Sequence, residues 1–132
     1  MANALYPYGK SEMLKGNIDL LSDTINVALV AGYSYSSSHT NYTTHISSFV
    51  VGTPVALGSK TVSATGVFDA DDVTFTAVPS GSTVNAFIIY KSSDGTLIGH
   101  VDTGTGLTGG FPTNGSNITI TFSSGGSKIF AL

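Results

Sequence analysis

The chain has 132 residues, a length typical of one domain, and its combination of 41% hydrophobic with only 10% charged residues is opposite to that of disordered chains. Its five basic residues are all lysines spread along the sequence and its net charge is −3, which argues against nucleic-acid binding through neutralised phosphates. The absence of cysteine excludes disulfides and thiolate metal sites, and with no long apolar stretch or basic-then-apolar leader we expect neither a membrane span nor a classical signal peptide.

The N-terminal stretch "MANALYPYGKSEMLKGNIDLLSD" contains the only good helical pattern. Ser11 is predicted to cap a short helix that has Met13 and Leu14 on one side, and Gly16 suits the end of that helix because glycine adopts the left-handed conformation without steric cost. We therefore expect residues 1–23 to form an N-terminal arm with a short helix, followed by a single β-sandwich domain at residues 24–132.

From residue 24 onward, strand signals dominate. Ile25, Val27 and Leu29 alternate with other side chains in "TINVALVAG", which predicts a strand with one buried face. Further strands, separated by turns that contain Gly, Asn, Ser or Asp, are predicted at residues 49–51, 55–62, 73–78, 84–91, 97–102, 118–122 and 127–132.

Two local features lie between these strands. Asp94-Gly95, whose residues tolerate positive φ, is predicted to join two strands as a hairpin. A single helical turn at residues 39–46 would place Tyr42 and Ile46 on the same inward side. Many short strands without long helices between them indicate an all-β fold, either a β-sandwich, a jelly roll or a small barrel, and argue against a parallel α/β sheet.

An acidic cluster stands in the phrase "GVFDADDVTFTAV", with Asp69, Asp71 and Asp72 close together. No glutamate follows that could complete a helix–loop–helix calcium motif. A different Ca²⁺ site shared with Asp94 or Asp102 is one interpretation. We favour the other, in which the short aspartate side chains bond nearby backbone N–H groups and shape a turn.

Other candidate chemistry is weak. His39 and His45 are six residues apart, whereas helical metal ligands usually stand three or four apart, so these two and His100 are interpreted as structural or solvated. No G-x-S-x-G motif marks a nucleophilic serine, and "TGTGLTGG" lacks the Gly-Lys-Ser/Thr of a phosphate-binding loop. We therefore predict no enzyme activity, no catalytic residues, no cofactor and no metal.

Aromatic residues suggest contact surfaces instead. Tyr33, Tyr35 and Tyr42 interleave with Ser and Thr, a composition suited to binding a partner, although packing against the edge of the sheet explains them equally well. Residues 103–117 are rich in Gly and Thr and are predicted to form a long exposed loop with Phe111 folded back.

Several phrases together resemble a family of small virion structural proteins of tailed bacteriophages, whose members are described as structural, head-decoration or cement proteins. These phrases are "MANALYPYGKSEMLKGNIDLLSDTINVALV", "KTVSATGVFDADDVTFTAV", "AFIIYK", "HVDTGTGL" and "SKIFAL". The resemblance implies a β-sandwich that assembles as a dimer or trimer on the outer surface of the virion capsid, where it binds the major capsid protein and stabilises the shell.

On this interpretation the N-terminal phrase is exposed in the isolated domain and makes contacts with the capsid or between protomers. The expected contact residues are Leu5, Tyr6, Pro7, Tyr8, Tyr33, Tyr35 and Phe111. An alternative is a tail or host-recognition protein, in which residues 33–42 and the loop at 103–117 bind a bacterial-surface glycan. A glycan-cleaving enzyme would need a pair of carboxylates about 5–9 Å apart in a cleft, and nothing in the spacing of the aspartates favours one.

Overall fold

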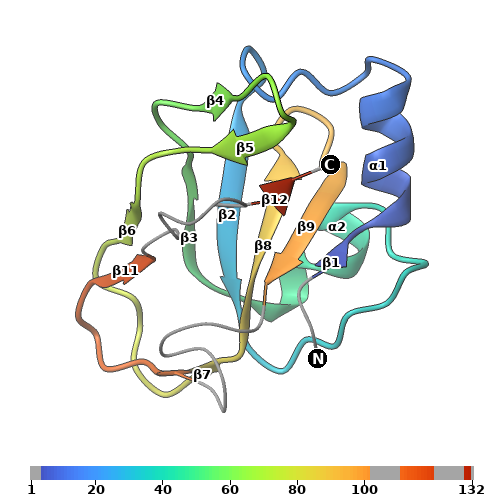
Figure 1. The fold of residues 1–132 in the computed structure, drawn as a ribbon. Coiled ribbons are helices and arrows are strands. Elements are labelled where there is room, and N and C mark those ends of the chain that lie inside the picture. Colours follow the sequence, from blue (N-terminus) through green and yellow to red (C-terminus); the bar gives the residue numbers. More distant parts are fainter. Residues whose placement is uncertain (1–3, 102–110, 121–129, 132) are drawn as a thin grey trace.

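Five strands form the central antiparallel sheet of the computed structural model, which describes residues 4–101, 111–120 and 130–131. Their order across the sheet is β1-β9-β8-β2-β3, so the N-terminal strand pairs with one from the second half of the chain (Figure 1). The bounds are Ala4–Leu5 for β1, Ile25–Val30 for β2, Val50–Ala56 for β3, Ala86–Lys91 for β8 and Leu97–Val101 for β9.

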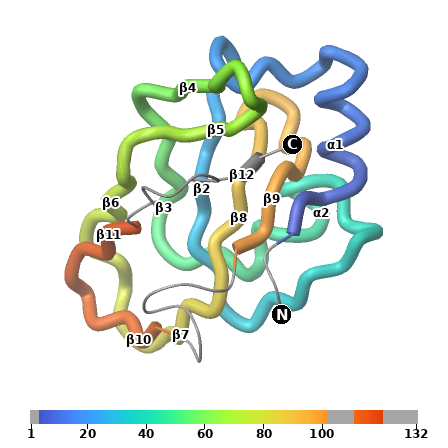
Figure 2. The backbone as a smooth tube through the Cα atoms, viewed as in Figure 1, coloured from blue at the N-terminus to red at the C-terminus, as the bar shows by residue number. Residues whose placement is uncertain are grey.

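The described residues form three further antiparallel sheets, all small, and β5 and β12 lie in front of the central sheet in Figure 1. The first contains β4 (Thr61–Val62), β5 (Val67–Asp69) and β12 (Phe130–Ala131); the second pairs β6 (Val73–Phe75) with β11 (Ile118–Ile120); the third pairs β7 (Thr83–Val84) with β10 (Phe111–Pro112). Figure 2 shows β10 beside β7. The predicted all-β class is confirmed, whereas the described strand order does not confirm a jelly roll.

The central sheet is buried on both faces. On the front, Val27, Leu29 and Ile89 pack with side chains of the small sheets in one hydrophobic core. On the back, Ala28 and Val30 belong to a second core that also contains tyrosines, and both are fully buried. The prediction of one buried face for this strand is therefore wrong, because residues 31–49 fold back over the second face.

The predicted N-terminal helix is present as α1 (Pro7–Leu14), but it begins earlier than expected. Tyr6 is the N-cap residue and Pro7 occupies the first helical position, where its fixed φ and missing N–H do no harm. Ser11 consequently lies inside the helix, so its predicted capping role is wrong. Gly16, at φ +80°, directly follows the C-cap residue Lys15, which confirms the predicted end.

Residues 4–23 are part of the domain's own packing. Ala4 and Leu5 pair with His100 and Gly99 at the edge of the central sheet. Helix α1 contacts β9, and Ile18 lies in the front core. The N-terminal arm is therefore packed along the β9 edge of the sheet (Figure 1).

The helical turn predicted at residues 39–46 is confirmed in shorter form as α2 (Tyr42–His45), followed by a 3₁₀ turn, η1 (Ser47–Phe49). Ile46 is buried, as predicted, and Tyr42 is half-buried. Asn41 caps α2 because its side-chain oxygen accepts a hydrogen bond from the N–H of Thr43 at 2.9 Å.

The remaining predicted strands are present with altered bounds. The strand predicted at 55–62 is divided between the end of β3 and β4, and the one predicted at 84–91 is interrupted at Asn85, whose N–H bonds the Val30 carbonyl at 3.0 Å. The strands β1, β5 and β10 were not predicted, because a strand of two or three residues is too short to show an alternation of apolar and polar side chains. Parts of the predictions at 97–102, 118–122 and 127–132, and most of the 103–117 loop, lie outside the described residues.

Candidate functional site

The predicted N-terminal contact residues fall into two groups. Tyr6 has no exposed surface and its N–H bonds the Ile98 carbonyl at 2.9 Å, so the expectation that this phrase is exposed is wrong for Tyr6. Leu5 is half-buried and packs against the front core. Pro7 and Tyr8 are exposed, with Tyr8 at 42% of its surface. Pro7 and Tyr8 are therefore the members of this phrase whose side chains the structure leaves exposed.

The other predicted contact residues divide in the same way. Tyr33 is buried because it belongs to the back core, and Tyr35 is half-buried against that core. Phe111 is exposed at 38% and pairs with Val84 through β10, so its side chain is not buried as a folded-back residue would be. The structure brings Tyr6, Tyr33 and Tyr35 together and leaves Phe111 outside this group.

A chain of hydrogen bonds links the buried tyrosines to a histidine. The hydroxyls of Tyr6 and Tyr33 are 2.8 Å apart, and the Tyr33 hydroxyl is 2.7 Å from Nδ1 of His39. All three groups are satisfied when Tyr6 donates to Tyr33 and Tyr33 donates to His39. Burial raises the pKa of Tyr6 far above its usual value, with the Tyr33 hydrogen bond as a second cause, and burial also raises the pKa of Tyr33.

The two histidines of residues 33–46 stack on each other. The rings of His39 and His45 have centroids 4.5 Å apart and an interplanar angle of 17°. Nδ1 of His45 accepts hydrogen bonds from the backbone N–H groups of Thr40 at 3.3 Å and Asn41 at 3.4 Å. His45 therefore carries its proton on Nε2 in this arrangement, as inferred from its partners. Burial, together with repulsion from His45, lowers the pKa of His39.

His100 extends this cluster from the sheet. It is 2% exposed, and its ring centroid lies 5.8 Å from that of Tyr33 and 5.3 Å from that of Tyr35. We call Tyr6, Tyr33, Tyr35, His39, His45 and His100 the Tyr–His cluster. The six-residue spacing of His39 and His45 argued against metal binding on one helix, but it did not reveal the stack, which depends on the irregular path of residues 39–45.

A second aromatic pair fixes α2 to the sheet. Tyr42 stacks on Tyr90 with centroids 4.2 Å apart and an angle of 14°. Burial raises the pKa of Tyr42 to about 12, with the neighbouring Tyr90 as a further cause. Nearby, the Asn41 side chain donates to the Asp94 carbonyl at 2.9 Å. Tyr90 was not predicted as part of a site. It lies two residues after Ile88 in β8, and this spacing indicated that both side chains lie on the same face of the sheet.

The predicted hairpin at Asp94-Gly95 is confirmed between β8 and β9. Gly95 has φ +77°, and its N–H bonds the Lys91 carbonyl at 2.9 Å. The Asp94 carboxylate accepts from the N–H of Thr96 at 3.0 Å and from its hydroxyl at 2.8 Å. Burial tends to raise the pKa of Asp94, but these hydrogen bonds and the charge of Lys91 lower it overall.

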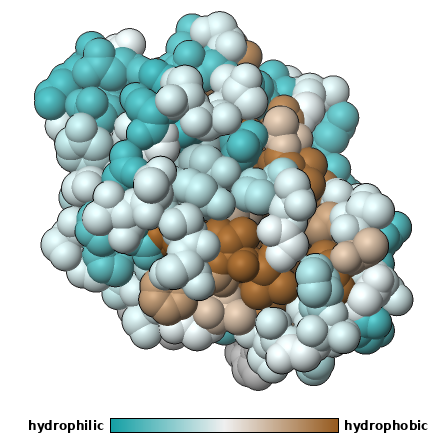
Figure 3. Space-filling model, turned by 180° about the vertical axis from the view of Figure 1, so that it is seen from behind, coloured by the Kyte–Doolittle hydropathy of each residue, from teal (hydrophilic) through white to brown (hydrophobic). Residues whose placement is uncertain are grey.

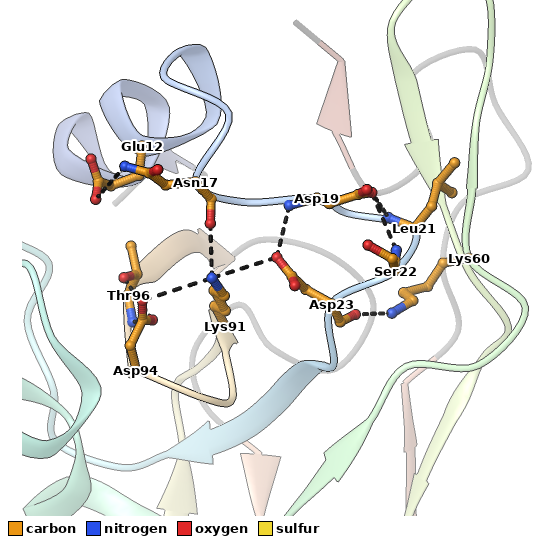
Figure 4. Close-up of polar contacts among 10 residues, drawn as sticks. All are labelled: Glu12, Asn17, Asp19, Leu21, Ser22, Asp23, Lys60, Lys91, Asp94 and Thr96. Carbon is orange, nitrogen blue, oxygen red and sulfur yellow. Dashed lines mark hydrogen bonds and ion pairs between the residues drawn. The ribbon is translucent and has the colours of Figure 1, made fainter.

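Lys91 ties this hairpin to the loop before β2 (Figure 4). Its ammonium donates to the Asn17 carbonyl at 2.8 Å and lies 3.6 Å from the Asp23 carboxylate and 3.8 Å from that of Asp94. The backbone carbonyl of Asp23 in turn accepts from the Lys60 ammonium. Lys91 therefore links the hairpin to the loop before β2. Its ammonium lies between the two carboxylates, in the position that a metal cation bound by them would occupy.

The acidic cluster connects two of the small sheets. Asp69 ends β5 and Val73 begins β6, while Asp71 and Asp72 are exposed between them. The N–H of Asp71 bonds the Gly58 carbonyl at 2.9 Å. Phe68 is buried on one side of the cluster, and Val73 and Phe75 are buried on the other. Within the described residues, no group of three or more His, Asp or Glu side chains is placed to hold a metal ion.

Large apolar side chains remain exposed on the surface. In the described part of the chain they are Tyr8, Leu14, Leu21, Phe49, Val62 and Phe111. Leu14 is 86% exposed at the end of α1, and Leu21 is 54% exposed in the loop that follows. Figure 3, which views the molecule from behind, shows apolar side chains gathered near the middle of that face with polar side chains around them.

None of the helices in residues 4–101, 111–120 and 130–131 has the length and apolar character needed to span a bilayer. Comparison of the chain with protein-family models, with curated proteins and with solved structures finds no match.

Proposed function

We propose that this protein is a capsid decoration (cement) protein of a tailed bacteriophage, which binds the major capsid protein on the outer surface of the shell and stabilises it. The phrases that resemble virion structural proteins run from the N-terminus to the C-terminus. The structural observation that carries the proposal is the exposure of Tyr8, Leu14 and Leu21 on one N-terminal segment. Such side chains are suited to contacts with a partner that removes them from water.

The remainder of the molecule suits a structural role. A sheet buried on both faces provides a stable platform, and a surface with few charges permits many copies to stand side by side on a lattice. A protein that binds only the assembled shell stabilises that state by mass action, and the effect grows with its concentration relative to the dissociation constant.

The alternative of glycan recognition receives less support from the same segment. It requires the rings of residues 33–42 at the surface, but Tyr33 is buried and Tyr42 is stacked on Tyr90. In the described conformation the Tyr33 ring is therefore unavailable to a sugar, and one face of the Tyr42 ring is occupied by Tyr90.

The test is the copy number of this protein in purified virions, measured by quantitative mass spectrometry against the major capsid protein. A ratio within a few-fold of the capsid protein is expected for a component of the lattice. A handful of copies per particle would contradict the proposal and place the protein at the tail or at a single vertex, where binding to bacterial-surface saccharides would be tested next.

A further inference from the structure

Residues 33–46 cover the back face of the central sheet with little regular structure of their own, since α2 is their only helix. Their attachment to the β8–β9 hairpin rests on a few polar contacts. The N–H of Tyr42 bonds the Gly95 carbonyl at 2.8 Å, and the N–H of Leu97 bonds the Thr40 carbonyl at 3.1 Å. Whatever disturbs Thr40 and Asn41 therefore loosens this attachment.

Nδ1 of His45 holds these two residues in place. It accepts from both of their backbone N–H groups, which a ring nitrogen can do only while it carries no proton. A proton added to this nitrogen would turn the acceptor into a donor that faces two other donors. The hydrogen bonds to Thr40 and Asn41 would then be lost together.

Protonation of His39 is also unfavourable in this arrangement. The stack at 4.5 Å brings two imidazolium charges face to face when both rings are protonated. Protonated Nδ1 of His39 would also donate to Tyr33, which must then donate to Tyr6. The hydroxyl hydrogen of Tyr6 would be left in a fully buried site, where the described part of the chain gives it no other hydrogen-bond partner.

We propose that the His39–His45 stack is an acid-sensitive latch, which holds residues 33–46 on the sheet while both rings are neutral and releases them when the rings are protonated. Release would separate Tyr42 from Tyr90 and uncover the back face of the sheet at Tyr90. The latch is a property of the fold and does not depend on the proposed function.

Among the described residues, no carboxylate is placed to stabilise the protonated rings. Neither imidazole forms an ion pair with a carboxylate among the described residues, and the nearest acid along the chain of contacts, Asp94, is engaged by Thr96 and Lys91. The other titratable groups around the pair are Tyr6, Tyr33, Tyr35, Tyr42 and His100.

The direction of the pH dependence follows from the lowered pKa of His39. Because the folded state binds fewer protons than the open state, the stabilisation is complete above the ordinary histidine pKa of about 6.5 and is lost as the pH falls through that value toward the folded pKa. For each proton taken up on opening, the opening equilibrium changes about tenfold per pH unit within this window.

The experiment is hydrogen exchange of the full chain, followed by NMR from about pH 7.5 to about pH 5 and corrected for intrinsic exchange rates. The protection factors of the Tyr42 and Leu97 amides are expected to fall about tenfold per pH unit for each proton, while the Leu57 amide, which bonds the Ile25 carbonyl at 2.8 Å, keeps its protection. Equal losses at all three amides would indicate global unfolding and would overturn the proposal.

A variant separates the latch from the third histidine. In His39→Asn with His45→Asn, an amide oxygen replaces each Nδ1 acceptor and cannot be protonated in this range, while His100 is retained. The pH dependence at Tyr42 and Leu97 is expected to disappear. Its persistence would overturn the proposal, and if the variant does not fold, the comparison of the three amides in the unmodified protein decides the question alone.

Discussion

Gly9 of α1 lies so close to Leu97 of β9 that a Cβ built on the glycine would stand 2.1 Å from the Leu97 carbonyl oxygen. No side chain larger than hydrogen fits there unless the helix or the strand moves. This contact places α1 directly against the backbone of the sheet. It also brings Tyr6, one turn before Gly9, into the back core.

Replacement of Gly9 by alanine is therefore expected to lower the free energy of unfolding by about 1–3 kcal/mol, because the added methyl group overpacks a backbone contact. Urea denaturation followed by circular dichroism measures the change. Gly58→Ala is the matched control, since its nearest neighbour is the Asp71 carboxylate at 4.0 Å. A loss for Gly9→Ala no greater than for this control would contradict the close contact.

Removal of the buried hydroxyl in Tyr6→Phe is expected to lower the free energy of unfolding by about 1 kcal/mol, because Tyr33 loses its partner at 2.8 Å inside the core. Tyr8→Phe removes the same atom from a side chain that is 42% exposed and serves as the control. Thermal unfolding of the two variants should rank them in this order. Equal melting temperatures would show that the Tyr6 hydroxyl is not part of a hydrogen-bonded chain.

Lys91→Met is expected to lower the free energy of unfolding by about 1–2 kcal/mol, since it removes a charged hydrogen bond and leaves the Asn17 carbonyl and two carboxylates without their common partner. Lys15→Met should cost less, because the ion pair of Lys15 with Glu12 involves a lysine side chain that is 61% exposed. Denaturation at low and high salt measures both. A larger loss of unfolding free energy for Lys15→Met than for Lys91→Met would contradict a stabilising role for the Lys91 contacts seen in Figure 4.

The lowered pKa of Asp94 predicts a loss of stability in acid. Its stabilising contribution is complete above the unfolded pKa of about 3.9 and is lost as the pH falls through the lower folded value. Asp94→Asn keeps an acceptor for Thr96 but does not titrate, so its stability should fall less between about pH 4 and about pH 2 than that of the unmodified protein. Parallel curves for the two proteins would show that Asp94 is not the titrating group.

The exposed leucines provide a test of the proposed capsid contact. Leu14→Ser with Leu21→Ser should leave the folded domain almost unchanged, because surface substitutions usually alter stability by less than about 0.5 kcal/mol. The same variant should bind purified shells that lack this protein at least about tenfold more weakly, as measured by sedimentation, if these side chains are buried in the complex. Val62→Ser, on the exposed strand β4, is the control. Unchanged binding would exclude this segment as the contact.

The features that the sequence determined are those with local causes. Alternating apolar residues indicated the β2 strand, the positive φ that Asp-Gly tolerates indicated the hairpin, and Gly16 marked the end of α1. The all-β class followed from many such short signals. Local chemistry also accounts for the turn at Tyr42, because Asn41 accepts a hydrogen bond from the residue two positions later.

Only the tertiary structure decided which side chains share a site. Tyr33 stands in a segment whose composition suits a contact surface, yet it is buried in the back core, where Tyr6, 27 residues away, bonds its hydroxyl. The two buried faces of β2, the contact of Gly9 with Leu97 and the pairing of the two-residue strand β1 all depend on partners distant in the chain. Local sequence patterns do not indicate such partners, because the burial of a residue depends on the segments that pack over it and not on its neighbours in the sequence.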